Sequence, residues 1–189
     1  AANGDLDKGV VVANDVREFR DLAGRYKGIS PNPLLGISSW SLARQAAQIY
    51  AGNGLKVYVA ALEGEGAVLT TPELSFAIGE LGCLGGVNFS ASHNHPDDNG
   101  VKVYDERGAQ SIPPDDQELM EIMQSVTDVK MVSLEEAVSS GKAGPLPDGV
   151  HESYLGLYSS DEGEAKSDSG PIVFTPLCGS GDSTVGDAL

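Results

Sequence analysis

Short apolar runs alternate with helical segments through the first half of this chain, and that alternation constrains its fold most. Three runs have the length and apolar character of buried strands, and they lie at residues 9–13, 55–60 and 86–89. A segment with apolar residues at helical spacing separates the first run from the second, and another separates the second from the third. The order strand, helix, strand, helix, strand predicts an α/β fold of three layers, α/β/α, around a mainly parallel mixed sheet.

Capping residues and glycines mark the ends of the two helices. Ser38 or Ser39 can cap the first helix, and Gly54 ends it. Thr71 can cap the second helix, with Pro72 in its first turn.

Further elements are expected beyond the third strand. We expect a short strand at 101–104, a helix from 114, a strand at 129–132 and a helix at 134–138. Residues 159–170 contain no large apolar side chain, which indicates an exposed linker, and 172–174 predict a new strand after it.

Polar side chains follow the strands at their carboxyl ends. Asp15 and Arg17 follow the first strand, Thr70 and Thr71 follow the second, and residues 92–94 follow the third. Ligands of parallel sheets bind beyond this edge, so we expect these clusters to converge on one site.

Ser92 is the candidate reactive residue of this expected site. It is delivered just after a strand, next to His93 and Asn94, and Lys102 follows ten residues later. A hydroxyl surrounded by cationic and amide donors suits a group that carries a phosphoryl. The alternatives are a capping serine, a structural histidine and a solvated lysine. We also expect Ser92 and His93 to point opposite ways, as neighbours in an extended segment do, which disfavours a serine–histidine relay.

The same run resembles the phosphoserine loop of the α-D-phosphohexomutases. The family pattern is Thr/Ser-Ala-Ser-His-Asn-Pro, three residues, then Asn-Gly-x-Lys. The chain matches it at Ser90, Ala91, Ser92, His93, Asn94, Asn99, Gly100 and Lys102. One departure is His95, which stands where the family usually has proline, with Pro96 after it.

Weaker matches extend the resemblance over roughly residues 9–126 and 171–187. They include Asp15-x-Arg17 and residues 175–181, which resemble the Thr-Pro-Leu-His-Gly-x-Gly that opens the second family domain, with Cys178 in place of histidine. The resemblance implies a phosphohexomutase domain 1 at 1–158, a linker at 159–170 and a truncated start of domain 2 at 171–189. The family's amino-terminal Gly-Thr-x-Gly-x-Arg-Gly loop is not recognisable in residues 1–8.

The resemblance also implies an activity, that of a phosphoglucomutase or phosphomannomutase. Ser92 would carry the phosphoryl group through a sugar bisphosphate, which also serves as activator, with His93 and Lys102 as further catalytic residues. Arg17, Asn94 and Asn99 would support the substrate and the loop. Mg²⁺ would be held by the phosphoryl group on Ser92 and by aspartates of a second domain, so this chain alone would be nearly inactive without the remaining domains. The alternatives are a sugar-phosphate binding module without catalysis and a phosphopentomutase of the same family.

Composition excludes several other classes. The net charge of −16 argues against a nucleic-acid surface, and no apolar run approaches the ~20 residues of a membrane span. The amino end lacks the pattern of a signal peptide, and Cys83 and Cys178 lack metal-ligand spacing, so we expect a cytoplasmic protein with reduced thiols.

The sequence allows two other interpretations of the site. The residues His93, His95, Asp97 and Asp98 allow a metal site, although a turn rich in Asp and Asn is the commoner explanation. A serine hydrolase is disfavoured because the chain has no Gly-x-Ser-x-Gly and only His151 remains as a distant base.

Overall fold

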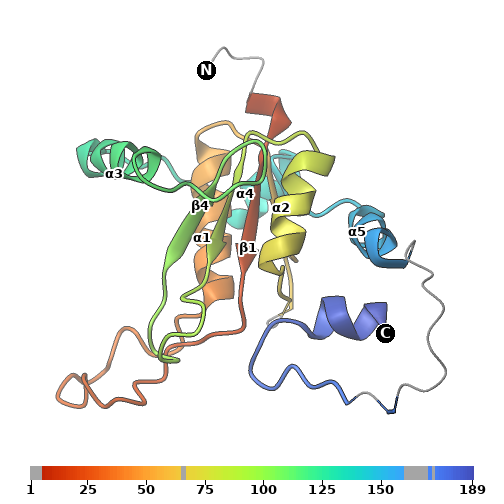
Figure 1. Cartoon of the computed structure of the whole chain (residues 1–189). Coiled ribbons are helices and arrows are strands. Elements are labelled where there is room, and N and C mark those ends of the chain that lie inside the picture. The colour runs from red at the N-terminus through yellow and green to blue at the C-terminus, as the bar shows by residue number, and fades with distance from the viewer. Residues whose placement is uncertain (1–5, 65–66, 160–169, 172) are drawn as a thin grey trace.

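A single twisted sheet forms the centre of the molecule (Figure 1). The computed structural model describes residues 6–64, 67–159, 170–171 and 173–189. In these residues the strands run in the order β4-β3-β1-β2-β5. Their bounds are β1 (Val10–Asn14), β2 (Val57–Val59), β3 (Gly86–Phe89), β4 (Val101–Tyr104) and β5 (Ala143–Pro145). All neighbours pair in parallel except β4, which is antiparallel to β3, so the predicted mixed, mainly parallel sheet is confirmed.

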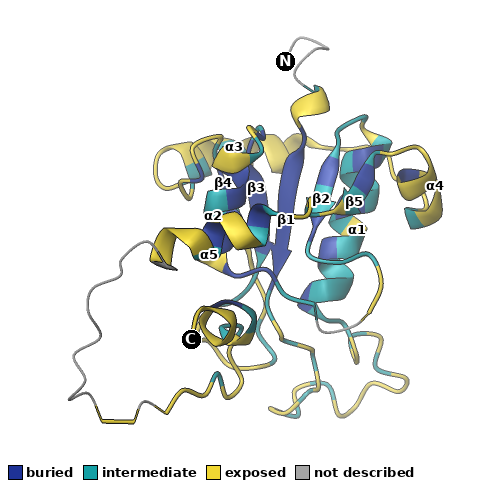
Figure 2. Cartoon of the chain, turned by 90° about the vertical axis from the view of Figure 1, so that its right-hand side faces the viewer, coloured by how far each residue is buried: buried dark blue, intermediate teal, exposed yellow. Residues whose placement is uncertain are grey.

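Helices cover both faces of the sheet (Figure 2). On one face lie α1 (Ser39–Gly52) and α4 (Leu134–Ser139), and on the other lie α2 (Thr71–Glu80) and α5 (Val150–Ser159). β1 alternates its side chains between the two: Val10 and Val12 pack with α1, whereas Val11 and Ala13 pack with α2. Both faces are therefore buried, as a parallel sheet requires, and the predicted three layers are confirmed.

One glycine is needed where β3 passes β1. A Cβ on Gly86 would lie 2.6 Å from the carbonyl oxygen of Val11 and 3.0 Å from Leu74 Cδ1. Because the nearest obstacle is backbone, only glycine lets α2 and β1 close on this strand.

The helix starts agree with the capping residues, with one shift. Ser38 caps α1 through a capping box with Ser41. The cap of α2 is Thr70, not Thr71 as predicted. The Thr71 hydroxyl instead accepts a hydrogen bond from Asn88 Nδ2 on β3, at 2.9 Å.

Helix α3 (Asp115–Ser125) forms as expected but packs on neither face of the sheet. It projects sideways from the top of the molecule (Figure 1). None of its residues is buried, and Met120, Ile122 and Met123 are at least half exposed. Its apolar spacing therefore predicts the helix correctly without marking a core.

The expected strand at 129–132 is wrong. This segment lies against the end of α1, where the Lys130 carbonyl accepts from Asn53 Nδ2 and the Val132 N–H donates to Gln48. Side chains and carbonyls of a helix take the place of a partner strand.

Other differences concern the second half of the chain. β5 and α5 were not predicted, since Ala-Gly-Pro carries little strand propensity, and β5 is tolerated as an edge strand. Val173 and Phe174 lie in no strand, because no described strand runs beside them to pair with. Ile172 and positions 160–169 of the expected linker lie outside the described residues.

Two short helical turns complete the described chain, a 3₁₀ turn at Leu6–Lys8 and a π-helical turn at Asp182–Gly186. Among the described residues, no helix combines the length and hydropathy needed to cross a membrane.

Buried and exposed apolar residues should affect the free energy of unfolding differently when their side chains are shortened to alanine. Leu74→Ala removes a fully buried side chain, so we expect a loss of about 2–5 kcal/mol in the free energy of unfolding. Met120→Ala on α3 should change it by less than about 0.5 kcal/mol, because Met120 is 53% exposed. Urea denaturation measures both, and a large cost for Met120→Ala would contradict the exposed position of α3.

Candidate active site

Asp15 directly follows strand β1, and both oxygens of its carboxylate accept hydrogen bonds. Asp15 Oδ1 accepts from the Arg17 N–H at 3.0 Å and from Ser39 Oγ at 2.6 Å. Asp15 Oδ2 accepts from Arg17 Nε at 2.9 Å. Burial alone would raise the pKa of Asp15, but hydrogen bonds from Ser39, the Arg17 backbone, Ser90 and the Arg17 side chain outweigh it and hold that pKa below its usual value. The carboxylate is therefore a fixed negative charge under Arg17.

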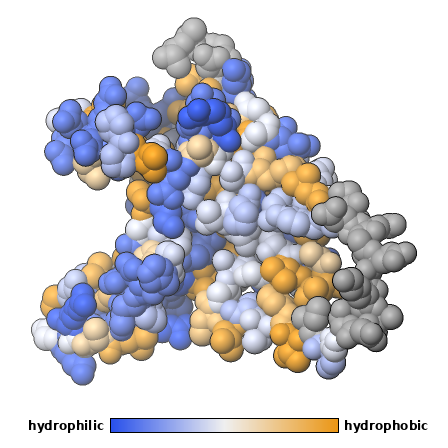
Figure 3. All heavy atoms as spheres, in the orientation of Figure 1, coloured by the Kyte–Doolittle hydropathy of each residue, from blue (hydrophilic) through white to orange (hydrophobic). Residues whose placement is uncertain are grey.

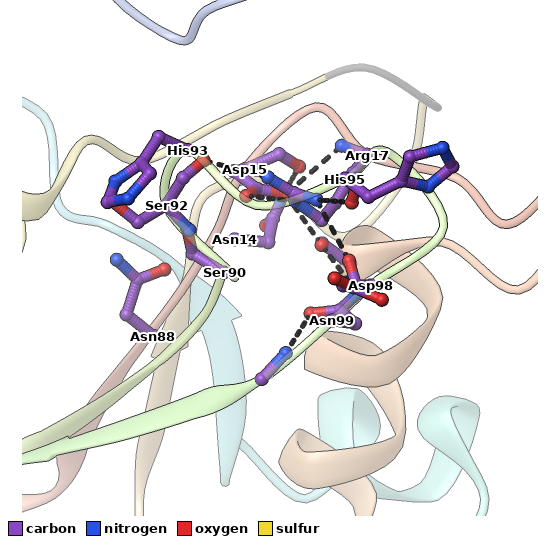
Figure 4. A network of polar contacts seen from close by, with 12 residues as sticks. Asn14, Asp15, Arg17, Asn88, Ser90, Ser92, His93, His95, Asp98 and Asn99 are labelled. Carbon is purple, nitrogen blue, oxygen red and sulfur yellow. Dashed lines mark hydrogen bonds and ion pairs between the residues drawn. The ribbon is translucent and has the colours of Figure 1, made fainter.

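Arg17 uses its guanidinium to hold the loop between β3 and β4. Nη2 donates to the Ser92 carbonyl at 2.8 Å, and Nη1 donates to the carbonyls of His95 and Asp98, both at 2.9 Å (Figure 4). The side chain is only 11% exposed. The planar fork thus fixes the path of the loop backbone, and few of its donors remain for a ligand.

Asn99 fastens the far end of the same loop. Its Nδ2 donates to Ser39 Oγ at 2.9 Å, and its Oδ1 accepts from the Gly100 N–H at 2.8 Å. Ser39 therefore joins Asp15 to Asn99, a link that the sequence did not indicate beyond the helix cap. The Asn94 N–H closes a turn onto the Ala91 carbonyl, and its side chain lines the cavity described below.

Ser92 sits at the turn of the loop with a left-handed backbone. Its φ is +55°, which is uncommon for a residue other than glycine, and strained backbone of this kind clusters at functional sites. The Ser92 N–H donates to Ser90 Oγ at 3.1 Å. The expectation that Ser92 and His93 point opposite ways is wrong, because this conformation is not extended: Ser92 Oγ and His93 Nδ1 lie 3.4 Å apart.

The predicted clusters do converge. Ser92, His93, Lys102 and Thr71 line one cavity of about 690 Å³ at the carboxyl edge of the sheet. Lys102 reaches it from β4, where it stands opposite Asn88. Within the described part of the chain, the Lys102 ammonium has no hydrogen bond or ion pair, so its charge is available to a ligand.

Several residues of this cavity were not predicted. Cys178, Gly179 and Ser180 close it from the carboxyl-terminal segment, and Arg20 and Leu22 line it from the loop after β1. The Thr-Pro-Leu-Cys-Gly match was the available signal for the first group. For the second group no sequence pattern was available.

The alternative metal reading is not supported. The Asp97 carboxylate accepts from the backbone N–H groups of Arg20 and Ala23, and His95 Nδ1 accepts from the Asp97 N–H. Across the described residues, no group of three or more His, Cys, Asp or Glu side chains is placed to hold a metal ion.

His151 lies elsewhere, in a second polar cluster. Its Nδ1 is 2.7 Å from Glu73 Oε1 and its Nε2 is 3.1 Å from Asp187 Oδ2. It lines a separate cavity of about 300 Å³ with Ser183 rather than with Ser92. This arrangement gives no support to a hydrolase relay from His151 to Ser92.

Sequence comparison decides the family. A model of the phosphoglucomutase/phosphomannomutase family, α/β/α domain I, matches residues 37–130, which include the whole Ser92 loop. The chain belongs to the α-D-phosphohexomutase family. The matched residues correspond to α/β/α domain I of that family.

Individual phosphohexomutases resemble the chain over most of its length. A phosphoglucomutase of Staphylococcus saprophyticus is 29% identical over 154 residues, which are 80% of this chain and 27% of the relative. The phosphopentomutase of Homo sapiens is 36% identical over 106 residues, 53% of this chain and 16% of the relative. The chain spans about a quarter of the length of the first curated relatives it matches.

A solved structure shares the fold. The open form of pp63/parafusin, a phosphoglucomutase from Paramecium, superposes with a TM-score of 0.54 at 16% identity, covering 84% of this chain and 29% of the other.

The hydrogen bonds of the Arg17 guanidinium predict that even a conservative substitution of Arg17 destabilises the protein. Arg17→Lys keeps the charge but cannot reach three carbonyls, so we expect a loss of about 2–3 kcal/mol in the free energy of unfolding. Amide exchange of residues 92–98 should accelerate with it. Arg107→Lys is the matched control, since Arg107 pairs with Asp105 at an exposed position, and its effect should be undetectable. Equal exchange in both variants would contradict the role of Arg17.

The His151 cluster predicts a pH-dependent contact. The hydrogen bond to Glu73 raises the pKa of His151 and outweighs its burial, with Asp187 contributing less. A raised folded-state pKa means that the stabilisation is complete below pH ~6.5, the usual value for histidine, and is lost as the pH rises through the folded-state pKa. NMR titration of His151 should show a midpoint that Glu73→Gln lowers more than Asp187→Asn. The reverse order would refute the dominance of Glu73.

Proposed function

We propose that this chain is the catalytic-serine domain of a phosphohexomutase that interconverts sugar 1-phosphates and 6-phosphates. The observation that carries the proposal is the position of Ser92, in a left-handed turn at the carboxyl edge of the sheet, inside a cavity shared with His93 and Lys102. The backbone of that turn is fixed by Arg17, so the hydroxyl is held before any ligand arrives.

Ser92 acts as the phosphoryl carrier in this proposal. The bond between phosphorus and Ser92 Oγ breaks as a bond forms between phosphorus and a sugar hydroxyl oxygen. The hydroxyl proton passes to water, and Ser92 Oγ takes up a proton to become a free hydroxyl. The product is a sugar bisphosphate, which turns over and returns its other phosphoryl group to Ser92. In the return step Ser92 Oγ loses its proton, and His93 Nδ1 at 3.4 Å is placed to take it.

Lys102 stabilises the transferring group. Phosphoryl transfer spreads negative charge over the equatorial oxygens, and fixed cations lower its barrier. Lys102 projects from strand β4, whose backbone is held by the sheet. Within the described residues its ammonium forms no ion pair with a carboxylate, and it lines the cavity of Ser92. Asn94 and Asn99 shape the loop around it.

Magnesium, the metal expected from the family, finds only part of its site here. A phosphoryl oxygen on Ser92 would be one ligand. Asp15, the acidic side chain nearest to the strand end, already accepts hydrogen bonds on both oxygens, and the described residues supply no other ligand set. We therefore propose that the carboxylate ligands come from further domains of the same polypeptide, and that residues 1–189 alone are nearly inactive.

Replacement of Ser92 tests the function. In the full polypeptide, Ser92→Ala should reduce exchange between glucose 1-phosphate and glucose 6-phosphate by at least about 1,000-fold, because no carrier remains. Ser139→Ala, an exposed serine at the end of α4, should retain full turnover. Peptide mass spectrometry should find phosphate on the Ser92 peptide of the parent protein. Undiminished turnover of Ser92→Ala would exclude the proposal.

The phosphopentomutase alternative is supported by the 36% identity to the human enzyme. Comparing turnover of glucose 1-phosphate with that of ribose 1-phosphate separates the two substrate classes. Binding of either without exchange would indicate a module that keeps the site but not the reaction.

A further inference from the structure

The loop at residues 18–37 has a defined internal structure. The Phe19 N–H donates to the Ile37 carbonyl at 2.8 Å and closes its base. The rings of Phe19 and Tyr26 meet edge to face, 5.7 Å apart, and the Asp21 carboxylate accepts from the Tyr26 N–H at 3.3 Å. The loop thus presents its side chains from a shaped backbone, and it forms the arm at the lower left of Figure 3.

Asp97 docks this loop onto the loop that carries Ser92. Its two carboxylate oxygens accept from the backbone N–H groups of Arg20 and Ala23, each at 3.1 Å, and its side chain is 9% exposed. Desolvation would raise the pKa of Asp97, but the backbone hydrogen bonds and His95 outweigh it, so that pKa lies below its usual value. Two loops that are more than 70 residues apart in the sequence are joined beside the cavity.

This contact brings Arg20 to the cavity of Ser92. Arg20 and Leu22 line the same space as Ser92 and Lys102. The nearest acidic group to the Arg20 guanidinium is Glu18, at 3.4 Å, and the Arg20 side chain is 66% exposed. An exposed pair at this distance is weak, so the guanidinium keeps donors for a ligand.

The charge of the protein favours such a donor. The net charge is −16, and an anionic ligand needs local cations to overcome that field. Arg17 is bound to Asp15 and to loop carbonyls. Of the described cavity residues, Lys102 and Arg20 are the cations that remain.

We infer that Arg20 binds a phosphate oxygen in this cavity and that the 18–37 loop is a wall of the sugar-phosphate site. The inference rests on the proposed function for the identity of the ligand. The phosphate oxygen has two possible sources, the phosphoryl group on Ser92 and the phosphate of a bound sugar phosphate. The family-model match begins at residue 37, so most of this wall lies outside the part of the chain that identifies the family.

The experiment compares Arg20→Ala with Arg25→Ala in the full polypeptide. Arg25 is exposed on the same loop but does not line the cavity, so it controls for the loss of one positive charge. Calorimetry with glucose 1-phosphate in a Ser92→Ala background, where no phosphoserine forms, isolates the sugar phosphate. We expect Arg20→Ala to weaken binding about tenfold, Arg20→Lys to restore part of it, and Arg25→Ala to leave it unchanged.

A second arm follows phosphorylated Ser92 by intact mass. If Arg20 binds the phosphoryl group on Ser92 instead, Arg20→Ala shortens the lifetime of phosphoserine while the calorimetric affinity stays constant, which also supports the inference. Unchanged affinity together with unchanged lifetime overturns it. Urea denaturation of Arg20→Ala confirms that the variant is folded.

The two proposals fail separately. Mutase turnover in the parent protein with no effect of Arg20→Ala in either arm rejects the role of Arg20 alone. Binding of glucose 1-phosphate that depends on Arg20, without any turnover in the parent protein, rejects the mutase function and retains the binding site.

Discussion

The arrangement of the site depends on the ion pair between Asp15 and Arg17. A charged guanidinium that is nearly excluded from solvent needs a counterion, and the Asp15 carboxylate supplies it at 2.9 Å. With that counterion in place, the guanidinium donates hydrogen bonds to three carbonyl oxygens of the loop after β3 and so fixes the path of the loop backbone. Through these contacts the two residues hold the loop backbone at Ser92 in place.

This ion pair also links the sheet to the two loops. Ser39 joins Asp15 to Asn99 and to the start of α1, and Asp97 joins the Ser92 loop to the 18–37 loop. Polar groups that bridge elements in this way are satisfied on several sides, so their loss propagates further than one contact. The parallel strands bring the two loops to the same edge of the sheet, and the hydrogen bonds between the loops set the distance between them.

The sequence predicted the parts of the fold that depend on regular patterns. Short apolar runs marked β1, β2 and β3, and cap residues marked α1 and α2 to within one position. It failed at β5, since Ala-Gly-Pro owes its strand conformation to β2 alone. It also failed at residues 129–132, since Val132 contacts helix α1 instead of a strand, while Val129 and Met131 are more than half exposed.

The candidate site divides in the same way. The convergence of Asp15, Thr71 and Ser92 followed from strand ends and was predicted. The contact between Ser92 Oγ and His93 Nδ1 depends on a positive φ, which no local pattern in the sequence indicates. The position of Arg20 in the cavity depends on hydrogen bonds between loops that are distant in the sequence. Such contacts produce no periodic pattern in the sequence, so they could not be predicted from it.

The left-handed backbone at Ser92 has a consequence for which residues can occupy the position. Threonine carries the same hydroxyl and would offer equivalent chemistry to a phosphoryl group. Its extra methyl group, however, makes a positive φ strongly unfavourable, as for every β-branched residue. The shape of the main chain thus favours serine over threonine, so the backbone conformation limits which hydroxyl side chain can occupy position 92.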